Sequence, residues 1–197
     1  DSSTSRGLGD VYKRQFRVSA EADNPNKDDY AIEDGFPTRM TNRADRGLEL
    51  LAELESISEQ QFFDIKHDKK YSVNSRAYAY LQQAASADLS AIQGDNLQNY
   101  QDAQTLITNW DLSTDIENRG AALSACVLGG EWLSEQRGID APKALDELVR
   151  CTDLLMSTSG RIDPLWGDVN RHVRGDLNIP VAGGPDTCLL YTSPSPR

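Results

Sequence analysis

The chain has 197 residues, with 31 acidic and 20 basic side chains and a formal net charge of −11 at pH 7. This acidic balance argues against a nucleic-acid-binding protein, because phosphates need a clustered positive surface. No stretch approaches the roughly 20 apolar residues of a membrane helix, so we expect neither nucleic acid nor a membrane among the partners.

The two ends of the chain resemble translated adapter DNA. Residues 5–15 and 188–197 can be encoded by two strings that are reverse complements apart from their end bases, and these strings resemble the adapter of a transposon-based sequencing library. Added segments of this kind are set aside before the fold is considered. We therefore expect 1–15 and 188–197 to be disordered, and 16–187 to be a natural segment cut from a longer parent protein.

Turn-forming residues dominate 16–36, where we predict irregular structure. Helical spacing begins at Thr38, and the apolar residues of the first predicted helix share one face: Met40, Ala44, Leu48, Leu51 and Leu54. Ser58 and Gln61 have the spacing of a capping box, in which the two side chains satisfy each other's backbone N–H groups. This pair predicts a second, short helix that contains Phe62, Phe63 and Ile65.

Four further helices are predicted from apolar spacing, over 75–87, 97–110, 121–133 and about 141–159. Asp115 or Asn118 opens the third of these, whose small residues favour close helix packing. Asp140 is the expected cap of the fourth, with Pro142 in its first turn and its end near Gly160. The predicted fold class of the natural segment is therefore mainly α, with about six helices plus ordered loops.

The segment 161–187 is predicted to be a loop with at most one short strand near 177–181. Gly183-Gly184-Pro185-Asp186 indicates a tight turn, and its backbone amides are a candidate for an anion site. Basic and acidic residues alternate before this turn, and we expect them to form structural ion pairs: Arg161, Arg171 and Arg174 with Asp163, Asp168 and Asp176.

The histidine inventory is too small to indicate a catalytic triad. His67 lies at a charged helix end and is expected to be solvated, and His172 is expected to make a loop contact. Asp163, Asp168 and Asn170 lack the glycine turn and closing glutamate of a calcium loop. We predict no metal site and no cofactor.

Two cysteines, Cys126 and Cys151, lie within apolar helical patterns of the natural segment. One disulfide between them is an alternative that the sequence leaves open. We expect two buried free thiols, because free cysteine is among the most buried residue types.

Three blocks of sequence are spread over the natural segment. The first is RMTNRADRGLELL (39–51), the second runs from Trp110-Asp111 to NRGAAL (118–123), and the third (160–187) contains Trp-Gly-Asp-x-x-Arg and Gly-Gly-Pro. In this order and spacing they resemble the penicillin acylase (penicillin amidase) family. The similarity is greatest to the branch of acyl-homoserine-lactone acylases and aculeacin-type acylases.

The resemblance implies a parent enzyme with the four-layer αββα fold of N-terminal-nucleophile hydrolases. Such a precursor cleaves itself, and the serine that opens its β-subunit attacks a linear N-acyl amide, with its own α-amine as the base. The natural segment would be a helical part of this β-subunit, bound to the rest of the α/β heterodimer. The family also implies a periplasmic or secreted protein and a small-molecule N-acyl amide substrate.

The family's nucleophilic serine and oxyanion asparagine would precede Phe16. Of its supporting residues, the arginine after that asparagine matches Arg43 best, with Arg46 as the second choice. The alternative is an Arg43 that pairs with Asp45 or with a neighbouring loop. We expect the chain alone to have no hydrolase activity. The competing hypothesis is a non-enzymatic helical interaction module or an inert relative.

Overall fold

Helices make up most of the chain that the structure describes. It is a computed structural model, and it describes residues 40–52, 54–92, 94, 96–137 and 139–187. The predictions for 1–15, 16–36 and 188–197 lie outside these residues. The mainly α class is confirmed for the described part, whose helices are α2 (Asn42–Leu51), α3 (Glu59–Lys66), α4 (Arg76–Ala85), α5 (Leu97–Thr108), α6 (Ala121–Arg137), α7 (Ala144–Ser159) and α8 (Trp166–Val169).

The first two described helices each begin after a residue whose side chain caps the helix. Before α2, the Thr41 hydroxyl accepts a hydrogen bond from the Ala44 N–H at 3.2 Å. Before α3, Ser58 and Gln61 form the predicted capping box, with reciprocal bonds of 3.2 and 3.0 Å. His67 follows the last residue of α3 and is exposed, as predicted.

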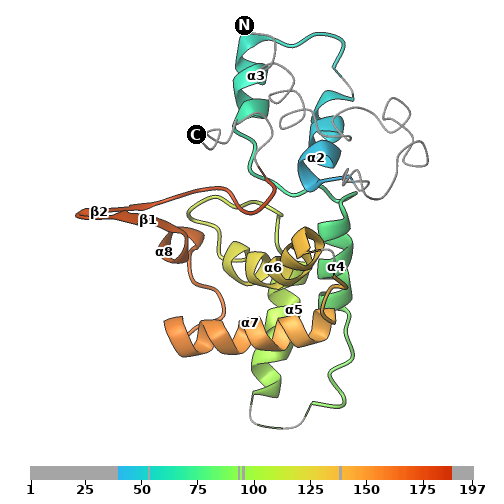
Figure 1. The fold of residues 1–197 in the computed structure, drawn as a ribbon, viewed down its shortest axis with the longest axis vertical. Helices are drawn as coiled ribbons and strands as arrows, with labels where there is room; N and C mark the ends of the chain where they lie inside the picture. Colours follow the sequence, from blue (N-terminus) through green and yellow to red (C-terminus); the bar gives the residue numbers. More distant parts are fainter. Residues whose placement is uncertain (1–39, 53, 93, 95, 138, 188–197) are drawn as a thin grey trace, which may run out of the picture.

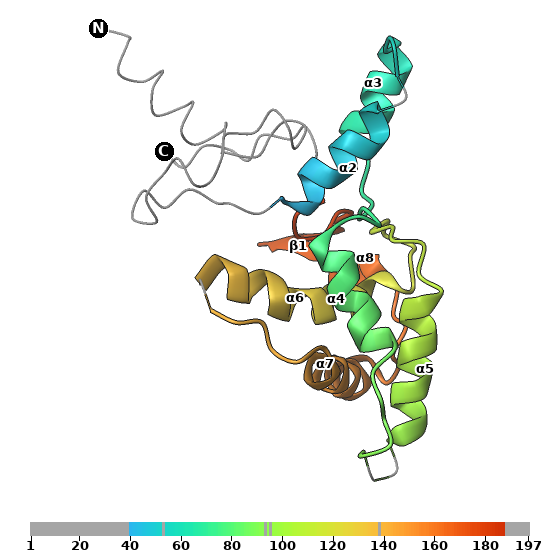
Figure 2. The ribbon, with the colours of Figure 1, turned by 90° about the vertical axis from the view of Figure 1, so that its right-hand side faces the viewer.

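Helices α4, α5, α6 and α7 pack against one another and enclose the apolar core (Figure 1). In the view of Figure 2, α7 is seen end-on while α6 lies across the page, so the two helices cross at a steep angle. Both views place α2 and α3 away from this bundle. The burial of apolar side chains drives the packing, and the core centres on Leu81, Ile107, Leu123, Val127 and Leu148.

The start of α6 is held by Asn118 and Gly120. The Asn118 side-chain oxygen accepts the N–H groups of Gly120 and Ala121, both at 2.9 Å, so Asn118 is the residue that opens the helix. A Cβ atom on Gly120 would lie 2.6 Å from Cδ1 of the buried Trp110 ring. Only glycine therefore lets the backbone pass this close to the indole.

Helix α7 begins later than predicted. Its N-cap is Lys143, so Pro142 precedes the helix and the expected cap, Asp140, lies outside it. The Pro142 carbonyl accepts a hydrogen bond from the Tyr80 hydroxyl of α4 at 2.9 Å. This contact holds the residues before α7 in a non-helical conformation. The spacing of apolar residues within 140–160 gives no indication of the contact, because Tyr80 lies in a distant segment.

The chain beyond α7 is more ordered than the predicted loop. Gly160 ends α7 with a left-handed φ of +68°, as expected for a glycine C-cap. The chain then forms α8 and an antiparallel hairpin of β1 (Arg171–Arg174) and β2 (Leu177–Pro180). β2 lies where the one short strand was predicted, near 177–181. The limit of one strand was wrong, because every side chain of β1 is exposed and no apolar alternation marks that strand.

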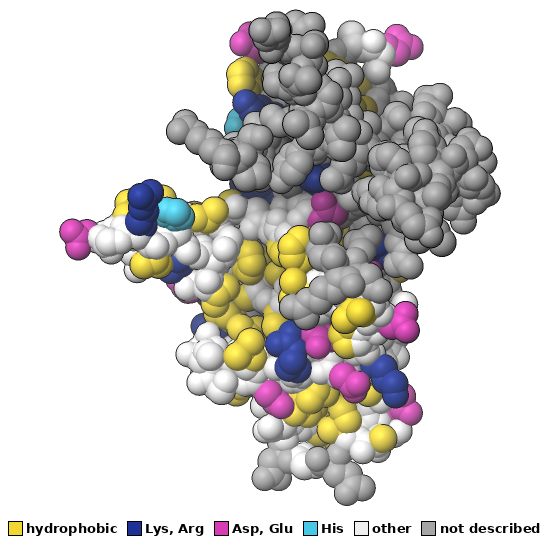
Figure 3. All heavy atoms as spheres, viewed as in Figure 1, with side chains coloured by type: hydrophobic (Ala, Val, Ile, Leu, Met, Phe, Trp, Pro, Cys, Tyr) yellow, Lys and Arg dark blue, Asp and Glu magenta, His cyan; other side chains and the backbone are white. Residues whose placement is uncertain are grey.

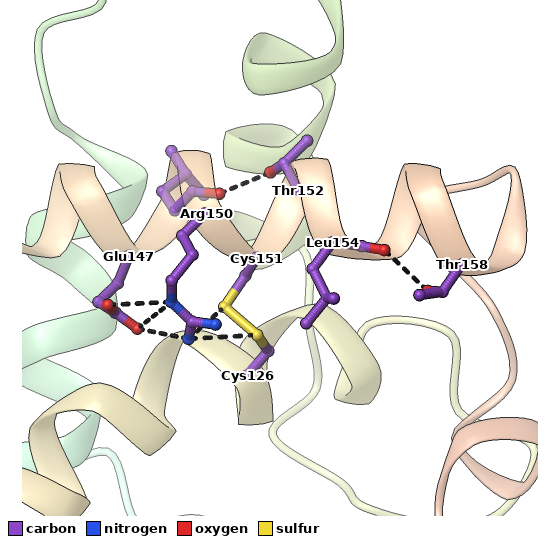
Figure 4. Close-up of a disulfide and its surroundings, with 8 residues drawn as sticks. Cys126, Glu147, Arg150, Cys151, Thr152, Leu154 and Thr158 are labelled. Atoms are coloured by element: carbon purple, nitrogen blue, oxygen red, sulfur yellow. Dashed lines mark hydrogen bonds and ion pairs between the residues drawn. A yellow bond between two sulfur atoms is a disulfide. The ribbon is translucent and has the colours of Figure 1, made fainter.

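Cys126 and Cys151 form a disulfide, so the prediction of two free thiols was wrong (Figure 4). The bond joins α6 to α7 across 25 residues of sequence. Cys151 is fully buried and Cys126 is half-buried. Both cysteines lie where the two helices pack. This packing gives the burial from which free thiols were predicted, and it also brings the two sulfur atoms together.

Candidate functional site

The turn at 183–187 is the candidate site, because the three blocks of sequence meet there. Gly183 and Asp186 have positive φ angles of +92° and +58°. The Thr187 hydroxyl accepts the Gly184 N–H at 2.9 Å, and the Gly183 N–H donates to the Thr114 carbonyl at 3.0 Å. The tight turn is therefore present. The two glycine amides that could have held an anion are bonded to the protein itself.

Helix α2 meets this turn through the Asp186 carboxylate. One of its oxygens accepts the Asn42 backbone N–H at 2.7 Å, and the other lies 3.1 Å from Nε of Arg43. The carboxylate therefore lies at the positive N-terminal end of α2, where an anion is stabilised. Block one and block three of the sequence are joined at this point.

Asn42 is buried and reinforces the same junction. Its side-chain amide donates to the Asp186 carbonyl at 2.9 Å, and its side-chain oxygen accepts the Ser72 N–H at 2.8 Å. The sequence did not single out Asn42, because its partner in the turn is 144 residues away. A single buried amide thus ties α2, the segment that precedes α4 and the 183–187 turn together.

Aromatic donors hold the other side of the turn. The Tyr71 hydroxyl donates to the Pro185 carbonyl at 2.6 Å, and Nε1 of Trp166 donates to the Gly183 carbonyl at 3.0 Å. Burial, with a smaller contribution from the Asp186 charge, raises the pKa of Tyr71, so its hydroxyl keeps its proton. Tyr71 also packs against Trp110 of block two. The carbonyl of Thr114, in the same block, accepts the Gly183 N–H and so joins block two to the turn.

The two candidate arginines have different partners. Arg43, the first choice, pairs with Asp186 of the neighbouring turn and remains about half exposed. Arg46, the second choice, binds both carboxylate oxygens of Asp68 at 3.0 and 2.9 Å and also contacts Glu49 at 3.1 Å. The hydrogen bond with Asp68 is the main cause that raises the pKa of Arg46. Arg46 is therefore held in a structural network, and Arg43 is the arginine at the turn.

The expected ion pairs after α7 form only in part. Arg161 binds Asp163 at 2.6 Å, and this hydrogen bond is the main cause that lowers the pKa of the carboxylate. Arg171 instead donates to the Gly167 carbonyl at 2.8 Å and to the Asn178 side chain at 2.7 Å. Arg171 thereby fixes the hairpin to α8.

Both histidines lie in exposed positions. His67 bonds the Phe63 carbonyl at 2.8 Å, and His172 lies in β1 opposite Ile179. Within the described ranges, no three His, Cys, Asp or Glu side chains gather as they would to hold a metal ion. Over the same ranges, no helix has the length and apolar character needed to cross a membrane.

Comparison of the chain with protein-family models and with curated proteins finds no match.

Proposed function

We propose that residues 16–187 belong to the catalytic β-subunit of an N-acyl amide hydrolase of the penicillin acylase type. The observation that supports this proposal is the convergence of the three resembling blocks on one turn. Asn42 and Arg43 come from the first block, Thr114 from the second, and Trp166 with 183–187 from the third. Blocks that lie far apart in the sequence are thus parts of one structural unit.

In this proposal the parent protein performs acyl transfer to water. The serine that opens the β-subunit attacks the amide carbonyl, releases the amine and forms an acyl-enzyme, which water then hydrolyses to the acid. Hydrogen-bond donors stabilise the oxyanion that forms in each step. Asp186 fixes the position of Arg43 at the start of α2, and the half-exposed Arg43 side chain orients the oxyanion asparagine or the substrate.

The disulfide supports a periplasmic or secreted location for the parent. Disulfides form and persist in oxidising compartments, and they are rare in proteins of the reducing cytosol. The Cys126–Cys151 bond joins two core helices of the described chain. This support is independent of the resemblance.

The test is expression of the parent gene, extended upstream of Phe16. We expect mass spectrometry to show self-cleavage that exposes an N-terminal serine, and a chromogenic N-acyl anilide to be hydrolysed. Arg43→Ala should lower kcat/KM by about 100-fold, because a displaced positioning group costs about this much. The matched variant Arg46→Ala should act mainly on stability. Turnover by the 197-residue chain alone would contradict the proposal.

The second candidate function is a non-enzymatic interaction module. Phe62 and Phe63 of α3 remain 47% and 42% exposed. Figure 3 also shows basic, histidine and apolar side chains together on the projecting hairpin. A parent protein that neither cleaves itself nor hydrolyses the anilide would favour this function over the hydrolase.

A further inference from the structure

The Arg150 side chain lies directly against the disulfide between α6 and α7. Its Nη2 atom is 3.2 Å from the sulfur of Cys151 and 3.6 Å from the sulfur of Cys126 (Figure 4). A guanidinium is always charged in proteins, and a cation beside a cysteine stabilises the thiolate over the thiol. The contact with Arg150 therefore favours the products of disulfide cleavage.

The two cysteines differ in their exposure to solvent. Cys151 is completely buried on α7, whereas Cys126 on α6 is only half-buried. A thiolate attacks a disulfide along the line of the bond that breaks, and the rate depends on access to the attacked sulfur and on the acidity of the departing thiol. The sulfur of Cys126, the more exposed residue, is therefore the electrophile, and the sulfur of Cys151, which lies closer to Arg150, is the leaving group.

We propose that Cys126–Cys151 is a thiol–disulfide exchange site that accepts electrons from a dithiol. A thiolate of the dithiol bonds to the Cys126 sulfur, and the Cys151 thiolate departs beside Arg150. The second thiol of the dithiol, after losing its proton, closes a disulfide within the dithiol and releases the Cys126 thiolate. Two electrons pass to the protein, and the two protons of the dithiol go to the cysteine sulfurs or, where a thiolate persists, to water.

Glu147 opposes this effect of Arg150. Its carboxylate accepts hydrogen bonds from Arg150 Nε at 3.1 Å and from Nη2 at 2.6 Å. The guanidinium is thus shared between a carboxylate and the disulfide, as the dashed lines of Figure 4 show. Loss of the Glu147 charge should leave Arg150 more available to the departing thiolate, so the two substitutions have opposite expected effects.

Cleavage of the bond leaves the rest of the core in place. Leu148 and Leu155 of α7 are buried with Leu123 and Val127 of α6 in one apolar cluster. These contacts do not depend on the sulfur–sulfur bond. Exchange can therefore occur in the folded chain, where it removes the covalent link between α6 and α7.

The test measures the reduction rate of the full chain by dithiothreitol at pH 7 without denaturant, by alkylation and mass spectrometry. All proteins carry Cys188→Ser, so that only the two natural cysteines react. We expect Arg150→Met to slow reduction about tenfold, because the leaving thiol loses its cation. Glu147→Gln should accelerate reduction severalfold. Arg174→Met on the exposed hairpin, which makes the same change in net charge as Arg150→Met, should leave the rate unchanged.

A second measurement identifies the attacked sulfur. With glutathione in place of the dithiol, the trapped mixed disulfide should map to Cys126. An adduct at Cys151 would overturn the proposal. Reduction rates of Arg150→Met and Glu147→Gln that match the rate of the chain with Cys188→Ser alone would also overturn it. The proposal would likewise be overturned if the reduction rate of the chain with Cys188→Ser alone rose with urea in step with global unfolding. If Arg150→Met fails to fold, the Glu147→Gln rate and the adduct position decide.

Discussion

Arg43 and Arg46 lie on the same short helix, but Arg43 pairs with one carboxylate and Arg46 pairs with two. Arg46→Ala should lower the free energy of unfolding by about 2 kcal/mol, because it leaves the half-buried Asp68 and Glu49 without their cation. Arg43→Ala should cost less than about 1 kcal/mol, because the Arg43 side chain is about half exposed to water and Asp186 keeps its hydrogen bond from the Asn42 N–H. Urea unfolding of the two variants measures this difference, and equal losses would contradict it.

Gly120 and Gly129 provide a matched pair at the start and in the middle of α6. Gly120→Ala should destabilise the chain by about 2 kcal/mol, because the added methyl group would collide with Trp110. Gly129→Ala meets no atom within 4 Å and should stabilise the helix by about 0.5–1 kcal/mol. Thermal and urea unfolding test both signs. A neutral Gly120→Ala would show that the indole ring can move aside.

The contact between α6 and α7 combines apolar packing with a covalent link. Removing the link in a Cys126→Ser, Cys151→Ser variant should cost about 3 kcal/mol, because the closed loop of 25 residues no longer limits the unfolded chain. The variant should keep the helical circular dichroism of the parent chain. Dithiothreitol should lower the urea midpoint of the parent chain and leave that of the variant unchanged. A parent midpoint insensitive to reduction would contradict this account.

Helices with local signals were predictable from sequence, whereas features set by distant contacts were not. The Ser58–Gln61 capping box and the Gly160 terminator need only neighbours within a few residues, and both were found where expected. The late start of α7 depends on Tyr80, which lies 62 residues before Pro142. The hairpin did carry a local signal, since Gly175-Asp176 is a two-residue turn between its strands. The hairpin was not predicted because its strands are exposed and therefore lack the alternation of apolar residues that was used to recognise strands.

The candidate site shows the same division between local and distant information. Arg43 was chosen because it matches a supporting arginine of the family that the first block resembles, but its partner Asp186 lies at the far end of the described chain. Asn42 and Tyr71 gain their roles only when the 183–187 turn returns to α2, through contacts 144 and 114 residues apart. Sequence spacing carries no information about such a closure.

At the scale of the whole molecule, this closure joins the beginning and the end of the described chain. Asp186 binds the start of α2, while Trp166 and Tyr71 bind the backbone of the same turn. The helical bundle between them supplies the apolar core. The turn is therefore held by segments that precede the bundle in the sequence and by one that follows it. Its conformation depends on the bundle being folded.

Alkaline pH should unfold the molecule through buried phenols that link its parts. Burial, with a smaller contribution from the Glu147 charge, raises the pKa of Tyr80 to about 12, from 10.0. Below pH 10 both folded and unfolded chains hold this proton, so the stabilisation is fully present. Between pH 10 and 12 the unfolded chain ionises first, and the free energy of unfolding should fall by at most about 1.4 kcal/mol per pH unit for this group.

Tyr80→Phe separates this effect from general alkaline damage. At pH 7 the variant should lose about 1 kcal/mol, because the hydrogen bond to the Pro142 carbonyl is gone. From pH 10 to 12 its stability should then fall less steeply than that of the parent chain. A residual fall is expected because the pKa of Tyr71 is also raised. Tyr78→Phe, on the same helix, controls for the loss of a hydroxyl group. Parallel curves for the unsubstituted chain and Tyr80→Phe would mean that Tyr80 ionises alike in the folded and unfolded chains, which would contradict this prediction.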